Sequence, residues 1–189
     1  MACEPDDILA EFEVSLQRRA LTLPQANADL KELDHLKSNL ERRLPYVSLT
    51  SEAARREVLI APVVLNLIDY TQAQLRIEYA IHVSEQLKGS LDYYLYTQQS
   101  LLVIEAKNAD LARGFTQLAV ELIALDRWIE SDESTLYEAV STGDVWQFGR
   151  LHRAQQRIEQ DINPYRVPAD LDELFRILIA LLTIADARF

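Results

Sequence analysis

Residues 89–125 read GSLDYYLYTQQSLLVIEAKNADLARGFTQLAVELIAL, and the rest of the chain is organised around them. Within this stretch, residues 101–108 (LLVIEAKN) form an apolar run of strand type that carries Glu105 and Lys107 two positions apart. Successive side chains of a strand point to opposite faces, so these two share a face. A carboxylate and an ammonium at the end of a buried strand are costly to fold, which indicates a chemical role.

A β-hairpin is predicted for residues 90–97 and 101–108, because the connection between these strands is so short. A further strand is expected before them, over residues 75–83. On the first hairpin strand Asp92 is expected to share a face with Tyr94 and Tyr96. Glu105 and Lys107 are expected on one face of the second hairpin strand.

A helix is predicted after the hairpin, over residues 111–129, with Asp110 as its cap and an apolar stripe that packs on the sheet. Gln117 lies on a second stripe of this helix, next to the end of the Glu105 strand. Beyond the helix, patterning predicts strands at residues 135–142 and 144–152, a short edge strand at 157–162 and a closing apolar helix after Asp170.

The segment before the hairpin predicts a long helix that starts after Thr50 or Ser51 and is either kinked or restarted at Pro62. At about 100° per residue, Glu57 falls in the apolar stripe of this helix with Ile60 and Val64. An acidic residue in such a stripe marks a functional site or reaches out to solvent from the edge of the stripe.

The N-terminal part is interpreted as a helical hairpin, with helices over residues 6–19 and 25–43 and a leucine stripe on the second helix. The stripe must be buried against the first helix, the body of the protein or a second chain, and we favour a homodimer contact. This interpretation divides the chain into two units, a helical hairpin over residues 1–45 and a main domain over residues 46–189. The element order predicts an α/β fold with helices against a mixed sheet.

Composition narrows the class of protein. The 189 residues carry a net charge of −11, which argues against a protein whose main task is to coat nucleic acid, although basic pairs and the group Arg150, Arg153, Arg157 stand out locally. The single cysteine and three scattered histidines exclude a disulfide framework and make a cysteine- or histidine-built metal site improbable. Without a membrane-spanning run or a signal-peptide pattern, we expect a cytoplasmic protein that makes no membrane contact.

Asp92 and Glu105, on adjacent strands, are the pair from which we predict a metal site. Two hard oxygen ligands close together, completed by water and a phosphate oxygen, are what Mg²⁺ prefers. Lys107 beside them can position or deprotonate an attacking water and offset charge in phosphodiester hydrolysis. Glu57 can add a metal contact, and Gln117 can fix the water or a phosphate by hydrogen bonds.

The order of these residues resembles the PD-(D/E)xK restriction-endonuclease-like superfamily, most closely the N-terminal nuclease domains of type I restriction R subunits and their stand-alone relatives. The matching motifs are Glu57, GSLDYYL with Asp92, LLVIEAKN with Glu105 and Lys107, and GFTQLAVELIAL with Gln117. Leu91 stands where the superfamily name has proline. The resemblance covers about residues 50–152 and implies a restriction-endonuclease-like αβββαβ core, DNA cleavage dependent on Mg²⁺ or Mn²⁺, Asp92 and Glu105 as metal ligands and Lys107 as the catalytic lysine.

Two functions agree with these features of the sequence. The first is a metal-dependent DNA endonuclease of a restriction, repair or mobile-element system. The second is a nuclease-fold protein that no longer cuts and acts as an interaction or assembly module, which the acidity favours. A partner subunit that supplies affinity for DNA would reconcile the acidity with the first function.

Overall fold

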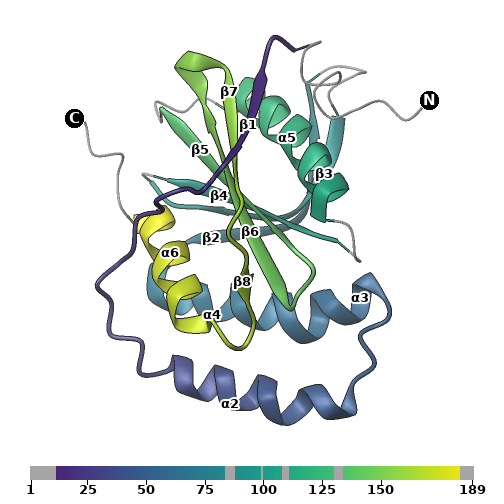
Figure 1. Ribbon diagram of the computed structural model, residues 1–189, viewed down its shortest axis with the longest axis vertical. Coiled ribbons are helices and arrows are strands. Elements are labelled where there is room, and N and C mark those ends of the chain that lie inside the picture. Colours follow the sequence, from purple (N-terminus) through teal and green to yellow (C-terminus); the bar gives the residue numbers. More distant parts are fainter. Residues whose placement is uncertain (1–11, 84–87, 99, 108–110, 130–133, 184–189) are drawn as a thin grey trace.

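The computed structural model describes residues 12–83, 88–98, 100–107, 111–129 and 134–183. Within these ranges the protein is an α/β fold with one mixed eight-stranded sheet (Figure 1). The strands are β1 (Ser15–Arg19), β2 (Gln74–His82), β3 (Lys88–Tyr96), β4 (Leu101–Ala106), β5 (Thr135–Ser141), β6 (Val145–His152), β7 (Arg157–Asp161) and β8 (Tyr165–Arg166). The helices are α2 (Leu33–Arg43), α3 (Glu52–Arg55), α4 (Ala61–Thr71), α5 (Leu111–Trp128) and α6 (Leu171–Thr183).

The strand order is β1-β7-β6-β5-β4-β3-β2, and β8 pairs with β6 beside this path. The pairs β4·β5 and β1·β7 are parallel, and the others are antiparallel. Helix α5 covers one face of the sheet, while α4 and α6 lie on the other (Figure 1). Strand β4 therefore lies in the middle of the sheet, buried on both faces.

Two hydrophobic clusters follow from this layering. The cluster on the α6 side contains Trp146, Phe148 and Phe175, all fully buried. The cluster under α5 contains Val103 and Leu122. Because β4 is buried on both faces, its sequence is a continuous apolar run rather than an alternation, and Glu105 interrupts that run.

The β3–β4 hairpin is confirmed. Tyr96 pairs with Leu101, and the ladder continues to the pair of Tyr93 with Ile104. The predicted helix after it is confirmed as α5, although Asp110, its expected cap, lies outside the described residues. The strands predicted at residues 135–142 and 144–152 are confirmed as β5 and β6, joined at Gly143, whose φ of +94° is readily adopted only by glycine.

The helical segment from Glu52 to Thr71 contains a π-helical turn, Arg56–Ile60, between α3 and α4. Ser51 caps its start, since the Ser51 hydroxyl accepts a hydrogen bond from the Ala54 N–H. Pro62 has no N–H to continue the α-helical ladder, and the Ala61 N–H bonds back to the Arg56 carbonyl instead. Pro62 thus starts the second half of the segment, which was one of the two expectations.

The predicted N-terminal helical hairpin is wrong in its described part. Residues Ser15–Arg19 form strand β1, which pairs in parallel with β7, and the second helix begins only at Leu33. The apolar residues of this segment fit the spacing of a helix, but Val14 and Leu16 also fit the alternation of a strand. Both of these side chains pack under α5. Strand β7 supplies the backbone hydrogen-bonding partners with which this segment forms a strand. Because β1 pairs with it, β7 is not the edge strand that we expected.

The leucine stripe of the second predicted helix is buried by the body of the protein. Leu33, Leu36 and Leu40 of α2 belong to the same hydrophobic cluster as residues of α4 and α6. Of the three burials that the sequence left open, the structure shows this one, so the stripe needs no second chain to cover it. None of the helices within the described residues is long and apolar enough to cross a membrane.

Candidate functional site

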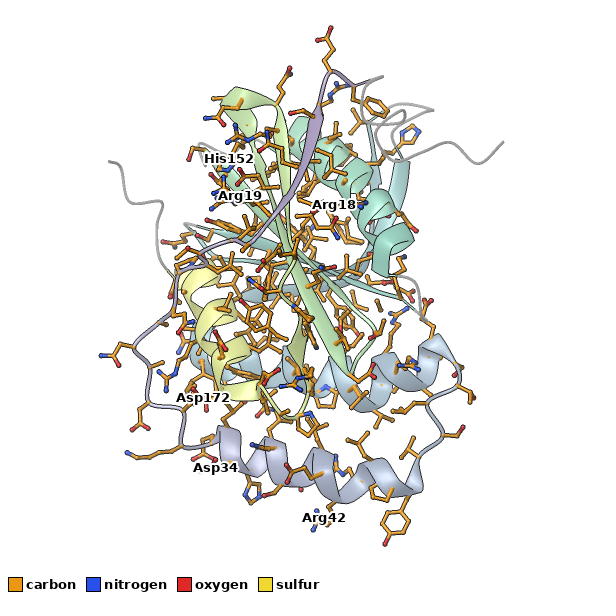
Figure 2. All side chains as sticks on the ribbon, viewed as in Figure 1. Arg18, Arg19, Asp34, Arg42, His152 and Asp172 are labelled. Atoms are coloured by element: carbon orange, nitrogen blue, oxygen red, sulfur yellow. The ribbon has the colours of Figure 1, made fainter. Side chains whose placement is uncertain are left out.

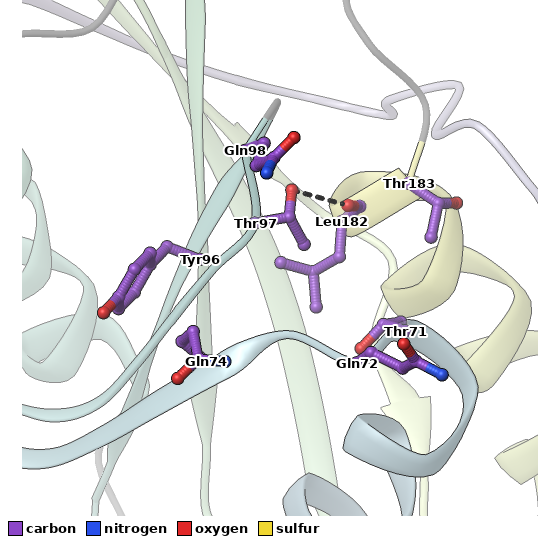
Figure 3. A pocket seen from close by; sticks show the side chains of 8 residues that line it. All are labelled: Thr71, Gln72, Gln74, Tyr96, Thr97, Gln98, Leu182 and Thr183. Carbon is purple, nitrogen blue, oxygen red and sulfur yellow. Dashed lines mark hydrogen bonds between the residues drawn. The ribbon is translucent and has the colours of Figure 1, made fainter.

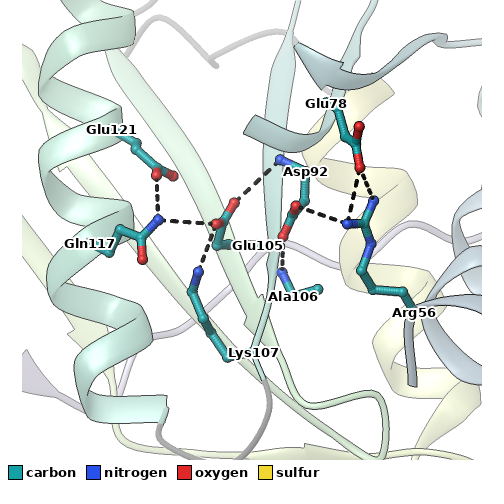
Figure 4. A network of polar contacts seen from close by, with 8 residues as sticks. All are labelled: Arg56, Glu78, Asp92, Glu105, Ala106, Lys107, Gln117 and Glu121. Atoms are coloured by element: carbon teal, nitrogen blue, oxygen red, sulfur yellow. Dashed lines mark hydrogen bonds and ion pairs between the residues drawn. The ribbon is translucent and has the colours of Figure 1, made fainter. Parts of the chain in front are cut away.

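Asp92 and Glu105 meet where β3 and β4 separate, beyond the last ladder pair of Tyr93 with Ile104. Side chains replace the ladder there, because the Ala106 N–H donates to Asp92 Oδ2 at 2.9 Å and the Asp92 N–H donates to Glu105 Oε2 at 3.3 Å (Figure 4). Each carboxylate is thus held by the backbone of the opposite strand. This exchange brings together the two predicted metal ligands.

The expected alternation along β3 is interrupted at Asp92. Leu91 and Tyr94 both pack under α5, whereas Tyr93 packs in the opposite cluster. Across from this point on β2, Glu78 has a φ of +51°, a left-handed conformation rare for a non-glycine residue. The regular alternation predicted for this strand therefore breaks between Leu91 and Tyr94, where the β2–β3 ladder omits the pair of Glu78 with Asp92.

Glu105 is almost fully buried, at 2% exposure, and gathers two more of the predicted residues. Its Oε1 atom accepts hydrogen bonds from Lys107 Nζ at 2.8 Å and from Gln117 Nε2 at 3.5 Å (Figure 4). Gln117 comes from α5 and also donates to Glu121 Oε1 at 2.8 Å. Four predicted site residues, Asp92, Glu105, Lys107 and Gln117, therefore lie within one polar network.

Glu57 is outside this network. Its side chain is exposed, so of the two interpretations left open for Glu57 the structure shows the side chain that reaches out to solvent, and not a site residue that faces the core. The projection at 100° per residue fails because Glu57 belongs to the π-helical turn, where the helix is wider. Within the described residues, Glu57 makes no hydrogen bond or ion pair with Asp92 or Glu105.

Arg56, which the sequence presented only as one of a basic pair, reaches the site in place of Glu57. Its Nη1 lies 3.5 Å from Asp92 Oδ1, and its guanidinium contacts Glu78 Oε1 at 3.4 Å (Figure 4). The guanidinium also lies over the Tyr93 ring, 5.6 Å from its centroid. The sequence carried no signal that set Arg56 apart from its neighbour Arg55.

Glu121 and Glu138 are two further carboxyl groups that the sequence analysis did not select. Glu138 of β5 is fully buried next to Val103, and Glu121 of α5 is 7% exposed. Among the described residues, neither oxygen of Glu138 nor Oε2 of Glu121 has a hydrogen-bond partner. In the sequence, each of these glutamates stands alone within an apolar segment, which is also the feature by which Glu105 was selected.

The electrostatics of the site are dominated by burial of negative charge. Burial and the nearby Asp92 charge raise the pKa of Glu105, against the opposing effect of Lys107. Burial and the Glu105 charge raise the pKa of Glu121 to about 8. Burial also raises the pKa of Glu138 well above its ordinary value. The site therefore holds more carboxyl groups than its own cations can balance.

Lys107 is the cation closest to Glu105. Burial lowers its pKa, but the hydrogen bond to Glu105 and the charges of Glu105, Glu121 and Asp92 outweigh burial, so the pKa is raised overall. Lys107 is therefore protonated at neutral pH and acts as a charged hydrogen-bond donor. Deprotonation of a water by Lys107 requires the removal of part of this negative charge first.

Asp92 and Glu105 supply the donor chemistry that a hard divalent cation takes. Their carboxylate oxygens face the point where the two strands part, and Arg56 and Lys107 neutralise them there. No group of three or more acidic, histidine or cysteine side chains suited to a metal ion occurs in the described part of the chain. The two carboxylates match a site completed by water and a phosphate oxygen rather than an all-protein cage.

A polar cavity of about 580 Å³ lies at the other end of the β2–β3 pair (Figure 3). Hydroxyl and amide side chains dominate its lining, and none of the lining residues that the structure describes is a carboxylate, lysine or arginine. Thr97 Oγ1 donates to the Leu182 carbonyl at 3.1 Å across it. The described lining offers no carboxylate or lysine for hydrolysis, so the candidate site is the Asp92–Glu105 network. The lining residues are Thr71, Gln72, Gln74, Tyr96, Thr97, Gln98, Leu182 and Thr183.

Comparison with known proteins gives no relative. The chain matches no family model, no curated protein and no solved structure. The functional argument therefore depends on the geometry of the site and on the resemblance of its motifs.

Proposed function

We propose that this protein is a divalent-metal-dependent endonuclease that hydrolyses phosphodiester bonds of DNA. The observation that carries the proposal is the meeting of Asp92, Glu105 and Lys107 at one point between two strands, with Gln117 bonded to the same carboxylate. The chain keeps this costly set of charges in a nearly buried place, as expected for a catalytic site.

The order of elements supports the same class. A helical segment is followed by β2, β3 and β4, then by α5 and by β5, which lies parallel to β4. This is the αβββαβ order implied by the resemblance to the PD-(D/E)xK superfamily. In this proposal, β1, β7 and α2 are additions around that core, and the protein acts in the cytoplasm.

Each residue has a distinct role in the proposed reaction. Asp92 and Glu105 would hold Mg²⁺ or Mn²⁺, which would supply a Lewis acid to polarise the scissile phosphate and lower the pKa of a water molecule. The Lys107 ammonium orients that water and balances charge that develops on the phosphate oxygens. The Gln117 amide keeps the Glu105 carboxylate in position, and Arg56 offsets the charge of Asp92.

Plasmid nicking tests the proposal. We expect Mg²⁺- or Mn²⁺-dependent nicking by the purified protein, reduced at least about a hundredfold in Lys107→Ala because a charged group in the transition state is lost. Lys31→Ala is the matched control, since Lys31 is exposed and its one ion pair within the described residues is with Asp29 on the surface. The absence of metal-dependent cleavage above the Lys107→Ala level on DNA or RNA would refute the enzyme.

The second candidate function is a silent nuclease fold that serves as an assembly module. Arg56 and Lys107 already neutralise Asp92 and Glu105, and a chain with a net charge of −11 has little general affinity for DNA. Titration of Mn²⁺ followed by calorimetry separates the candidates. A silent fold predicts no binding that depends on Asp92, whereas the nuclease predicts binding that Asp92→Asn removes. A DNA-binding partner subunit remains compatible with the nuclease.

A further inference from the structure

Basic side chains from three adjacent strands converge on one buried carboxylate, Glu159 of β7, which is 1% exposed. Arg150 of β6 contacts Glu159 Oε2 through Nε at 2.8 Å and Nη2 at 2.7 Å, and His152 Nε2 lies 3.0 Å from the same oxygen. Arg157 and Arg19 approach Oε1 at 3.4 Å and 3.6 Å. The parallel pairing of β1 with β7 is what brings Arg19 to this place.

Arg150 and His152 supply the hydrogen bonds of Glu159 Oε2, whereas Arg19 and Arg157 approach Glu159 Oε1 only at ion-pair distances. Within the described residues, neither guanidinium makes a hydrogen bond, and Nε of Arg157 is buried without a partner. Their side chains are 59% and 30% exposed. Two arginines with unused donors therefore lie side by side at a surface that external anions can reach.

The charge of this cluster is opposite to that of the whole protein. Three guanidinium groups face one carboxylate, so the cluster keeps a net positive charge within a chain of net charge −11. Burial alone would raise the pKa of Glu159, but the bonds from Arg150 and His152 lower it overall, so Glu159 stays ionised. One carboxylate needs fewer cations than this, and the excess is suited to a second anion.

We propose that Arg19 and Arg157, oriented from behind by Glu159 and Arg150, bind a phosphate group. A guanidinium presents parallel N–H donors that match the oxygens of a phosphate, and the partly exposed side chains of Arg19 and Arg157 carry donors that Glu159 leaves unused. The group is either free phosphate or a phosphodiester of a nucleic-acid strand, since the bonding to the guanidinium groups is the same.

This anion site is separate from the candidate nuclease site. Arg150 and His152 lie on the same side of β6 as Phe148, in the cluster covered by α6, whereas Glu105 lies on the α5 side. Strand β5 separates β6 from β4 in the sheet. Figure 2 shows Arg19 and His152 near the β1 end of the molecule, far from α2 with Arg42. The inference therefore holds whether or not the protein cuts DNA.

Binding in EDTA tests the proposal, with inorganic phosphate followed by calorimetry and a short fluorescein-labelled single-stranded oligonucleotide followed by anisotropy. We expect Arg19→Gln and Arg157→Gln each to weaken binding about tenfold, as for the loss of one charge-assisted contact. Arg42→Gln is the matched control, because Arg42 is an exposed arginine on α2 whose side chain, in the part of the chain that the structure describes, bonds to Asn39 alone. Thermal melts establish that each variant is folded.

The two probes identify the source of the phosphate. Binding of inorganic phosphate with no gain from the oligonucleotide supports a free-phosphate site, and tighter binding of the oligonucleotide supports a nucleic-acid backbone. If Lys107→Ala leaves the binding of both probes unchanged, the phosphate site is separate from the proposed nuclease site. The proposal is overturned if neither probe binds, or if folded Arg19→Gln and Arg157→Gln variants bind as well as Arg42→Gln.

Discussion

One buried glutamate, Glu159, lies on one face of the sheet, and three others, Glu105, Glu121 and Glu138, lie on the opposite face. The two sites differ in the number of cations that surround the carboxyl groups. Glu159 is enclosed by Arg19, Arg150, His152 and Arg157. Glu105 shares Lys107 with Glu121, and Glu138 behind them has no partner among the described residues. The same residue type therefore has a lowered pKa at Glu159 and a raised pKa at Glu105, Glu121 and Glu138.

This difference separates a carboxylate that its own cations neutralise from carboxyl groups that lack such cations. The cations around Glu159 join β1, β6 and β7, so that carboxylate stabilises the added part of the sheet. The carboxyl groups around Glu105 destabilise the fold unless a proton or an external cation compensates them. A surplus of carboxyl groups is expected where a metal ion completes the site.

Among single substitutions at neutral pH, the largest expected change in stability is at Glu159. Glu159→Met should lower the free energy of unfolding by about 3 kcal/mol, because it leaves several partly buried cations without their anion. We expect this loss in urea denaturation at neutral pH. A loss below about 0.5 kcal/mol would mean that the cations are solvated rather than paired with Glu159.

Glu138→Met should act in the opposite direction. Replacement of an unpartnered buried carboxyl group by an apolar side chain of similar length should raise the free energy of unfolding by about 2 kcal/mol. The measurement is again urea denaturation, with Glu159→Met as the comparison. Destabilisation by both substitutions would remove the distinction between the two groups.

The pH dependence should show the surplus of carboxyl groups directly. Glu121 has a pKa of about 8 in the fold against an ordinary value of 4.5, so the native state binds more protons between these values. Stability is then highest below pH 4.5 for this group and falls as pH rises towards 8, by up to about 1.4 kcal/mol per pH unit. Glu121→Gln should flatten this part of the profile measured by thermal unfolding, and an unchanged slope would contradict the assignment.

The smallest expected effect belongs to Gln117. Gln117→Ala removes donors to Glu105 and Glu121 from an exposed position, which should cost about 0.5–1 kcal/mol of stability. Gln25→Ala, which removes an exposed bond to Glu173, is the control with no expected change. Equal effects of the two substitutions would show that Gln117 does not organise the site.

Much of the fold and of the candidate site could be predicted from the sequence. The hairpin, α5 and the strands β5 and β6 follow from local periodicity and short connections, and the motifs on them brought Asp92, Glu105, Lys107 and Gln117 together. Arg56 could not be predicted in place of Glu57, because a π-helical turn changes which side chain faces the sheet. The interruption of the β2–β3 ladder at Asp92 could not be predicted either, since it depends on the pairing of two strands and on the left-handed backbone of Glu78.

The sequence by itself determined which segments are apolar, where the tight turns fall and which strand carries a carboxylate beside a lysine. These are local properties, set by side-chain type and spacing along the chain. Only the tertiary structure decided that Ser15–Arg19 is a strand, and that Glu159 is matched by cations while Glu138 has no partner. Those outcomes depend on contacts between residues far apart in the chain, such as Arg19 with Glu159, which no local pattern contains.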